Sequence, residues 1–244
     1  MRSFYSLLAS EGLKLRKSPI WLLVPISPFL MLLIGMLMNL DGIGEADRAS
    51  TVLSTMAMMH SILLLPIMTG VWSAFVCRYE HGGGGWKQLL ALPISRTELY
   101  LAKLAVVALL VLAAQLLFLA AAWLVMIRHG IEPSWRLLLG SVVGGWAACL
   151  PLAALQLAVS TLWSSFAAPL ALNVMLVLPN MMVVNSADIS PFYPWAQPTL
   201  LMMSGGTMDF GGYTIPYWQL LTTVIGSFLV FLTGGLAYFN RKEI

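Results

Sequence analysis

The residues of this chain with the most chemical potential form a polar island, residues 78–96, between two long apolar runs. Its centre is His81, four glycines, Trp86 and Lys87. A glycine-rich run before a lysine resembles a phosphate-binding loop, but that loop continues with Ser or Thr, and here Gln88 follows the lysine. The His-Gly-Gly-Gly stretch resembles an esterase oxyanion-hole element, but no GxSxG nucleophile elbow accompanies it. We therefore expect no catalytic residue and no ATP binding by this chain alone.

The positions of the histidines and cysteines do not indicate metal binding or thiol chemistry. His60, His81 and His129 lie far apart in sequence and have no partners at metal-ligand spacing. Cys77 and Cys149 are the only cysteines, each lies in or at the edge of an apolar run, and no CxxC motif occurs. We expect two buried free thiols and no metal site.

The polar island has the pattern of a short helix. Glycines 82–85 free the chain to turn after the preceding apolar run. Trp86, Leu89 and Leu90 then recur at i, i+3 and i+4, which gives one apolar face, and Pro93 ends the pattern. This face either rests on lipid, as a linker helix, or fits a groove in a cytoplasmic partner.

Residues 2–17 have the pattern of an amphipathic helix. The apolar side chains expected on one stripe are Phe4, Leu7, Leu8 and Leu15, and the charged side chains expected elsewhere are Arg2, Glu11, Lys14 and Arg16. Such a helix can lie in the head-group layer with its cations near anionic lipid. The alternative is an ordinary basic flank that happens to be helical. No small-x-small cleavage site follows, so we expect this end to be retained rather than cleaved as a signal peptide.

The composition is that of a membrane protein. Of the 244 residues, 59% are hydrophobic and 9% are charged, whereas soluble domains carry roughly 25% charged residues. The mean hydropathy is +0.86. Six apolar segments of at least ~20 residues, enough to cross a bilayer as helices, are residues 19–40, 52–77, 99–127, 137–163, 167–187 and 217–239. Ser95 to Glu98 fits a capping box at the start of the third.

The basic residues predict the orientation. With the N-terminus in the cytoplasm, ten Lys and Arg are cytoplasmic: Arg2, Lys14, Arg16, Lys17, Arg78, Lys87, Arg96, Lys103, Arg241 and Lys242. Only Arg48, Arg128 and Arg136 lie outside. Cytoplasmic loops carry the excess of Lys and Arg, so we expect both termini and the loop 78–98 in the cytoplasm, and the stretch 188–216 outside. No basic run indicates nucleic-acid binding.

The predicted spans have no Asp, Glu, Lys or Arg near their centres. Ion-coupled pumps use such residues, so the energy for any transport is expected to come from another chain. The polar side chains expected to join helices by hydrogen bonds are His60, Gln115, Gln156, Asn173 and Asn180. The small residues expected to permit close packing are Gly140, Gly144, Gly145, Gly234 and Gly235.

Taken together, these features resemble the permease subunits of type-2 ATP-binding-cassette (ABC) exporters, in particular the lantibiotic-immunity and bacitracin-export branch. The loop carries the sharpest match, with Glu80, Gly82 to Gly85, Trp86-Lys87-Gln88-Leu89-Leu90, Pro93-Ile94-Ser95-Arg96 and Lys103. Residues 193–198 and 239–243 add weaker matches. The run of four glycines departs from commoner family loops, in which a threonine often follows the first glycine.

The resemblance implies a coupling helix in the loop 78–98, seated in a cleft of a separate ABC ATPase. The residues that it assigns to ATPase coupling are Glu80, Gly82, Gly85, Trp86, Lys87, Leu89, Leu90, Pro93 and Arg96. It makes residues 2–17 an elbow helix, with Phe4, Leu7, Leu8, Lys14 and Arg16 as its key residues. It also implies a second permease chain, identical or similar, and places ATP and Mg²⁺ in the ATPase, with no cofactor in this chain.

We therefore expect one all-α transmembrane permease domain, residues 1–244, with six spans in a bacterial cell membrane. Its expected function is ATP-driven export of a hydrophobic peptide antibiotic, and no residue is assigned to substrate binding. The alternatives are a motor-free channel, a membrane enzyme acting on lipid, and a non-transporting anchor or sensor subunit docked to an ATPase. Transport without ATP would favour the channel, and a polar cluster at the membrane interface would favour the enzyme.

Overall fold

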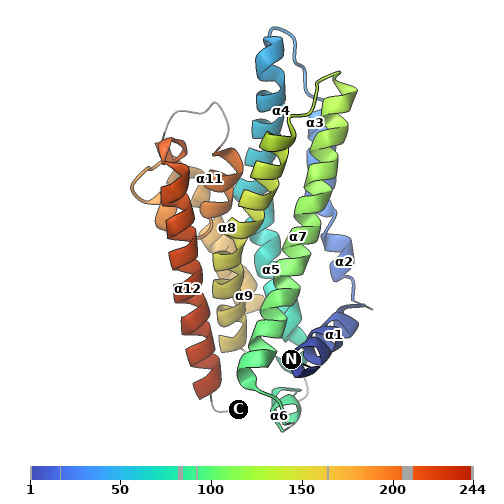
Figure 1. Cartoon of the computed structure of the whole chain (residues 1–244). Helices are drawn as coiled ribbons and strands as arrows, with labels where there is room; N and C mark the ends of the chain where they lie inside the picture. Colours follow the sequence, from blue (N-terminus) through green and yellow to red (C-terminus); the bar gives the residue numbers. More distant parts are fainter. Residues whose placement is uncertain are drawn as a thin grey trace.

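The long apolar runs fold into long helices that stand side by side, as the computed structural model shows (Figure 1). The second run is a continuous helical rod, Glu45–His81, built from α4 (Glu45–Met59), one π-helical turn η1 (His60–Leu64) and α5 (Leu65–His81). The other long helices are α7 (Arg96–Arg128), α8 (Trp135–Leu162) and α12 (Tyr217–Arg241). The structure describes residues 2–16, 18–81, 85–91, 93–163, 165–204 and 211–242, and within these ranges it contains no strand.

Two of the expected spans are interrupted by proline. The first is split into α2 (Ile20–Leu23) and α3 (Ile26–Met36), with Pro25 between them. The segment 167–187 is split into α9 (Ala167–Val177) and α10 (Asn180–Val183), with Pro179 between them. Proline lacks an N–H and clashes with the preceding turn, which explains both breaks.

Four helices in the described part of the chain are long and apolar enough to cross a membrane. They become five if α1 (Arg2–Arg16) and the segment α2–α3, which meet at 82°, are counted as one broken span. Ala167–Val183 is apolar but shorter. The structure thus supports four or five of the six expected spans.

The stretch 188–216 is more than a surface loop. It contains η2 (Ser190–Phe192), α11 (Gln197–Met203) and η3 (Gly211–Thr214). Every residue of α11 is buried, and this helix packs against α8, α4 and α12. The stretch therefore turns back into the bundle between its long helices.

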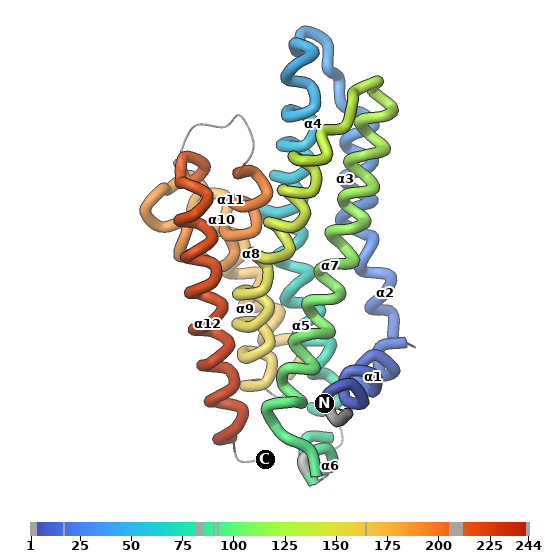
Figure 2. The backbone as a smooth tube through the Cα atoms, viewed as in Figure 1, coloured from blue at the N-terminus to red at the C-terminus, as the bar shows by residue number. Residues whose placement is uncertain are grey.

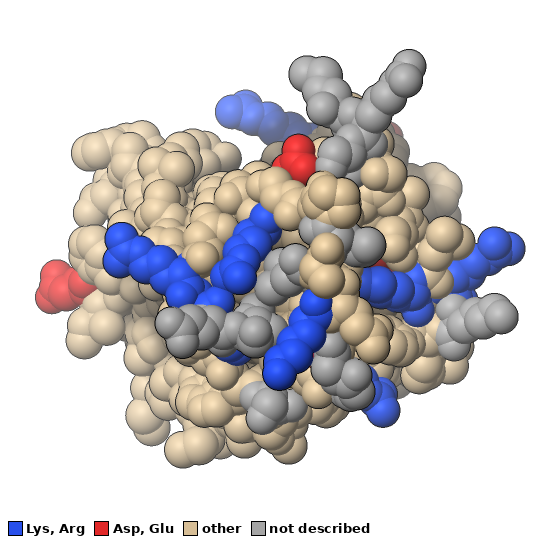
Figure 3. Space-filling model, turned by 90° about the horizontal axis from the view of Figure 1, so that it is seen from below, with Lys and Arg blue, Asp and Glu red and all other residues tan. Residues whose placement is uncertain are grey.

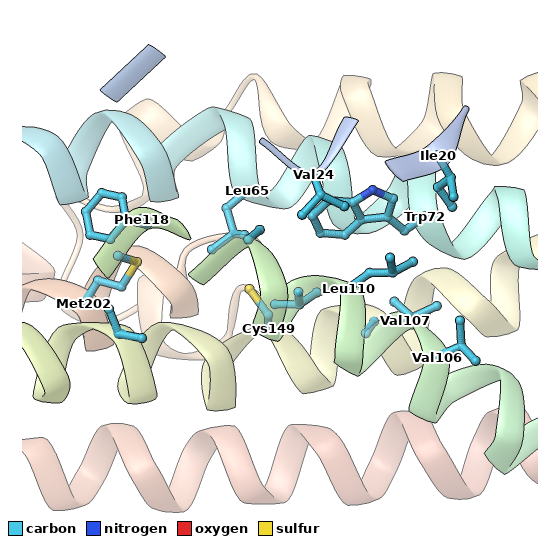
Figure 4. Close-up of a cluster of buried hydrophobic side chains, with 14 of the residues drawn as sticks. Ile20, Val24, Leu65, Trp72, Val106, Val107, Leu110, Phe118, Cys149 and Met202 are labelled. Atoms are coloured by element: carbon cyan, nitrogen blue, oxygen red, sulfur yellow. The ribbon is translucent and has the colours of Figure 1, made fainter. Parts of the chain in front are cut away.

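Helices α7 and α8 form the centre of the molecule. They pack against each other; α7 also contacts α1, α3 and α5, and α8 contacts α5, α11 and α12. The apolar core lies between them and α5 and extends along the bundle, from Phe118 and Met202 past Cys149 to Leu110 and Trp72 (Figure 4). Both cysteines are buried and free, as predicted.

Two asparagine side chains donate hydrogen bonds to backbone carbonyls of the rod Glu45–His81 around Pro66. Pro66 has no N–H to donate to the Ile62 carbonyl four residues earlier, and the Asn180 Nδ2 donates to that carbonyl instead, at 2.8 Å. Asn173 Nδ2 donates to the carbonyls of Pro66 and Ile67 at 3.1 and 3.2 Å. The expected role of these side chains in joining helices is confirmed.

The remaining predicted polar side chains also bridge helices. Asn173 Oδ1 accepts from Gln156 Nε2 at 2.9 Å and from Trp195 Nε1 at 2.8 Å. Gln115 Nε2 points at the Met202 sulfur, 3.5 Å away. His60 Nδ1 lies 2.6 Å from the hydroxyl of Ser27 in α3, and its ring stacks on Phe118.

The expected glycine contacts are confirmed at some positions and wrong at others. A Cβ at Gly145 would lie 2.3 Å from the Gln115 side chain, and one at Gly235 would lie 2.2 Å from the Tyr100 hydroxyl, so these side chains pack directly on the glycines and would have to shift to admit a larger residue. At Gly144 a Cβ would lie 3.1 Å from the Leu201 carbonyl oxygen. At Gly140 and Gly234, by contrast, it would meet no atom within 4 Å, so these two glycines do not mediate packing within this chain.

The chain begins and ends at the same end of the bundle. Helix α1 crosses that end, the last turn of α12 reaches it, and α6 (Gly85–Leu90) hangs below it (Figures 1 and 2). The N-terminal helix, the polar island and the C-terminus therefore lie together, as the expected topology requires.

Candidate functional site

The short helix α6 is fastened to the bundle by the side chain of Trp86. Its indole is 7% exposed and packs edge-on against Phe239 of α12, with ring centroids 5.2 Å apart. The ammonium of Lys103, from α7, lies 5.6 Å from the indole ring centre. A buried aromatic ring with a cation over its face is a strong local anchor. The helix predicted by the i, i+3, i+4 pattern thus exists, but its Trp86 face packs against its own bundle. The expectation that this face rests on lipid or fits a partner's groove was wrong.

His81 ties the same indole to two further elements. The indole N–H of Trp86 donates to His81 Nδ1 at 3.3 Å, and His81 Nε2 lies 2.7 Å from the carbonyl oxygen of Ser160 in α8. A carbonyl only accepts and an indole N–H only donates, so these two contacts assign the donor role to Nε2 and the acceptor role to Nδ1. His81 therefore links the end of α5 to α6 and α8.

Four charged side chains form a closed cluster just above α6. Lys14 Nζ lies 2.5 Å from Glu11 Oε1 and 2.6 Å from Glu80 Oε1. Lys103 Nζ lies 2.8 Å from Glu11 Oε2 and 3.0 Å from Glu80 Oε2. Each ammonium thus bridges both carboxylates, and the charges cancel. We call this group the ion cluster; it joins α1, α5 and α7.

The ion cluster is almost fully removed from solvent. Glu11, Glu80 and Lys103 are 3%, 2% and 1% exposed. Lys103 Nζ also donates to the carbonyl oxygen of Val76 at 2.9 Å. Charges in such surroundings are tolerated only when they are paired and hydrogen-bonded. The cluster therefore fixes how three helices meet, because none can move away without exposing an unpaired charge.

Arg96 joins the start of α7 to the end of α12. Its Nη1 donates to the carbonyl oxygens of Lys242, Asn240 and Phe239 at 2.8, 3.2 and 3.3 Å. These are the carbonyls that a helix leaves without partners at its C-terminus. Ser95 caps α7 in turn by accepting from the Glu98 N–H, as predicted.

The structure places most of the predicted loop residues at this junction. Gly85 is required there, because a Cβ would lie 2.8 Å from the Cα of Glu80. Leu89 packs partly buried against the core, whereas Lys87 and Pro93 are exposed. Gly82 lies outside the described residues, as does the Leu90 side chain. Glu80 and Trp86 are buried within this chain, so any part they take in coupling acts through α5, α6 and α7 rather than by direct contact with a partner.

The N-terminal helix differs from its prediction in one important residue. Leu7, Glu11 and Leu15 are all buried, so the carboxylate lies on the same stripe as the leucines. The expectation that Glu11 lies elsewhere was wrong, since positions i, i+4 and i+8 share one helix face. Phe4 and Leu8 pack partly buried beside that stripe, Lys14 is half-buried in the ion cluster, and Arg16 is exposed.

The sequence prediction missed Glu11 and His81 as parts of the site. The periodicity of Leu7, Glu11 and Leu15 was the signal that could have placed Glu11 inside. No local signal pairs it with Lys103, which lies 92 residues further along the chain.

The end of the molecule that carries α6 is rich in exposed cations. Seen from that end, Figure 3 shows Lys and Arg side chains spread over the face, with few carboxylates among them. Arg16, Arg78, Lys87 and Arg241 are exposed at the ends of α1, α5 and α12 and on α6. This basic surface attracts either an acidic protein surface or anionic lipid head groups.

The chain is similar to a known protein family. A family model described as ABC-2 family transporter protein matches residues 7–180, which is more than half of the chain. The matched region runs from α1 to the start of α10 and includes the ion cluster and α6. No curated protein matches the chain.

Proposed function

This chain belongs to the ABC-2 family of transporter proteins, and from that premise we propose that it is a permease subunit driven by a separate ATPase chain. The observation that carries the proposal is the junction of α6 with the bundle. Trp86 and the ion cluster attach this short helix and its neighbours to α1, α5, α7 and α12 through buried contacts. Helix α6 acts as the coupling helix and α1 as the elbow helix.

The buried contacts make α6 suitable for transmitting movement. A displacement of α6 shifts the Trp86 indole, and this indole contacts Phe239 of α12, His81 of α5 and Lys103 of α7. Packed interiors transmit such shifts instead of absorbing them. The long helices therefore move together with α6. The end of α12 moves with them, because Arg96 is hydrogen-bonded to it.

The proposed cycle has two states selected by nucleotide. ATP brings the two ATPase subunits together, and their motion moves the coupling helices of two permease chains. The path between the permeases then changes from inward-open or membrane-open to outward-open. A ligand shifts such an equilibrium only by binding one state more tightly, so ATP must favour the closed motor. ATP and Mg²⁺ bind the ATPase, and this chain acts as the non-catalytic subunit.

The proposed ATPase contact is the exposed side of α6. Lys87 and Gln88 are exposed there, next to Arg78 and Tyr79 at the end of α5. This patch is basic, so the complementary cleft on the ATPase is acidic and the association weakens as salt rises. Lys87 is the best residue for testing contact, because it is exposed while Trp86 and Glu80 are buried.

The proposed cargo is a hydrophobic peptide antibiotic of the lantibiotic or bacitracin type. Support comes from the resemblance of the loop 78–98 to that branch and from the absence of charged residues at the span centres. Export would protect a bacterial cell from the peptide, which enters the transporter from the lipid.

The test is a gentle-detergent pull-down of the tagged full-length chain from its native membrane, with wild type, Lys87→Glu and the control Arg128→Glu. Arg128 is an exposed arginine in the last turn of α7, at the opposite end of the bundle. We expect a subunit with a Walker A motif to co-elute with wild type and Arg128→Glu, and to be lost with Lys87→Glu. If no such subunit accompanies the wild type, the proposal is wrong.

A transport measurement separates the competing functions. In proteoliposomes that contain the purified complex, the proposal predicts peptide movement with ATP and none without it. Equal movement in both conditions would indicate a motor-free channel. ATP hydrolysis without peptide movement would indicate an anchor or sensor subunit.

A further inference from the structure

A cavity lies at the end of the bundle opposite α6. It has a volume of about 280 Å³ and is bounded by α4, α8, α11 and α12. Its apolar wall comes from Leu53, Leu201 and Met202, and Arg136 and Ser141 of α8 line it as well. Small-molecule sites begin at about 300 Å³, so this cavity lies at the lower limit of that range and holds at most one slender ligand.

Ser141 is one of the residues that line this cavity, and its hydroxyl has no partner. Ser141 is 5% exposed, and its Oγ makes no hydrogen bond. Hydroxyls on the neighbouring rod donate to a carbonyl four residues earlier: Ser61 to Ala57 at 2.6 Å and Thr69 to Leu65 at 2.8 Å. Ser160, Ser190 and Thr199 have unpartnered hydroxyls as well, and what distinguishes Ser141 is that it lies in the wall of a cavity, where a ligand can supply the acceptor atom.

Arg136 gives the cavity a positive charge. It is exposed in the first turn of α8, and no carboxylate lies among the described residues that line the cavity. Trp135 precedes Arg136 in the sequence, Tyr217 lines the same cavity, and Trp218 follows Tyr217. All three are exposed, and such aromatic residues mark the head-group level of a membrane. The charge therefore lies where lipid head groups lie, while Ser141 lies five residues further along α8.

We propose that this cavity binds a single-chain amphiphile with a phosphate head group. The Arg136 guanidinium holds the phosphate by charge-assisted hydrogen bonds. The Ser141 hydroxyl donates to an oxygen between head and chain, such as an ester carbonyl. The apolar chain runs along Leu53, Leu201 and Met202. Binding here needs neither the ATPase nor transport.

The experiment measures equilibrium binding of radiolabelled 1-dodecanoyl lysophosphatidate to the purified full-length chain in a non-ionic detergent. Two unlabelled competitors separate the parts of the ligand: glycerol 3-phosphate has the head group alone, and monododecanoylglycerol has the ester and chain without the phosphate. We expect saturable binding to one site per chain, with each competitor at least tenfold weaker than unlabelled lysophosphatidate. If either competitor matches it, the proposal is overturned, because one half of the ligand would then be irrelevant.

Variants locate the site. Arg136→Gln removes the charge, and Gly140→Leu fills the cavity, because Gly140 lines it and a Cβ there would meet no atom within 4 Å. We expect each to weaken binding at least tenfold, and Ser141→Ala to weaken it several-fold. The matched controls are Arg128→Gln and Gly226→Leu, an exposed arginine and an open glycine outside the cavity.

Wild-type affinity in Gly140→Leu would place the ligand elsewhere and overturn the proposal. Thermal unfolding of each variant shows whether it is folded. If Arg136→Gln fails to fold, Gly140→Leu and the competitor series on the wild type still decide the outcome.

Discussion

At the scale of single residues, Lys103 shows how a buried charge can determine the position of helices. Its ammonium contacts Glu11 of α1, Glu80 of α5 and the carbonyl of Val76. An apolar side chain in its place would leave two buried carboxylates to share Lys14. The energetic consequence is large, because breaking a buried ion pair from one side leaves an uncompensated charge.

Lys103→Met therefore lowers the free energy of unfolding by about 3–5 kcal/mol. Adding Glu80→Gln restores neutrality, since Glu11 and Lys14 remain paired, and we expect the double variant to be more stable than Lys103→Met. Thermal unfolding in detergent measures both. Glu132→Gln, at an exposed carboxylate between α7 and α8, is the control and is expected to have no effect. A double variant as unstable as the sum of the two single changes would show that the charges are not coupled.

Arg96 makes a second residue-scale prediction, at the end of α12. Without its guanidinium the carbonyls of Phe239, Asn240 and Lys242 lose their donor. We expect Arg96→Gln to speed amide hydrogen exchange in the last turn of α12 roughly tenfold, corresponding to about 1.4 kcal/mol of local stability. Arg241→Gln, in the same turn but exposed, is expected to leave the exchange rates unchanged. Equal exchange in both variants would remove Arg96 from the capping role.

At the scale of elements, the rod Glu45–His81 shows how a π-helical turn and a proline are accommodated inside a span. The turn η1 lies immediately before α5, which carries Pro66 as its second residue. The Asn180 side chain, from α10, replaces the missing donor to Ile62. The short helix α10, which follows the break at Pro179, thus supplies the hydrogen bond that Pro66 cannot make inside the continuous rod.

The pair Pro66 and Asn180 is suited to a double-mutant cycle. Asn180→Leu leaves the Ile62 carbonyl buried without its donor, at a cost of about 1–3 kcal/mol. In a Pro66→Ala background the backbone N–H of residue 66 can donate to that carbonyl, so the same change is expected to cost less. Unfolding measurements on the four proteins give the coupling energy. A coupling energy near zero would show that Asn180 does not substitute for the proline.

The sequence predicted the long elements well, because hydropathy and length determine them. The expected segment 99–127 is observed as Arg96–Arg128, and 137–163 as Trp135–Leu162. Hydropathy carries no information on helix breaks, so the breaks at Pro25 and Pro179 do not show in it. The cap at Ser95 was predicted because its signal is local.

The site was less predictable than the helices for a physical reason. Glu11 was placed with the solvent-facing charges because a carboxylate is costly to bury unless it is paired. Its partner Lys103 lies 92 residues away, and a single sequence does not show which distant residues meet. The contacts of Trp86 are equally hard to predict from the sequence, because its partners come from three separate helices, α5, α7 and α12.

At the scale of the whole molecule, the arrangement of charges predicts the orientation in the membrane. Helix α6, the start of the chain and the end of α12 lie together at one end of the bundle (Figure 2). The exposed cations of that end are the ones that the positive-inside rule places in the cytoplasm. The opposite end contains Arg128, Glu132 and Arg136, and it is therefore expected to face outward.

Cysteine labelling tests this orientation directly, because Cys77 and Cys149 are buried and give little background. We expect Glu132→Cys to react with a membrane-impermeant maleimide in intact cells. Arg241→Cys, exposed at the end of α12, is expected to react only after the membrane is permeabilised. The reverse pattern would put α6 outside the cell, beyond the reach of any cytoplasmic ATPase, and would exclude the proposed coupling.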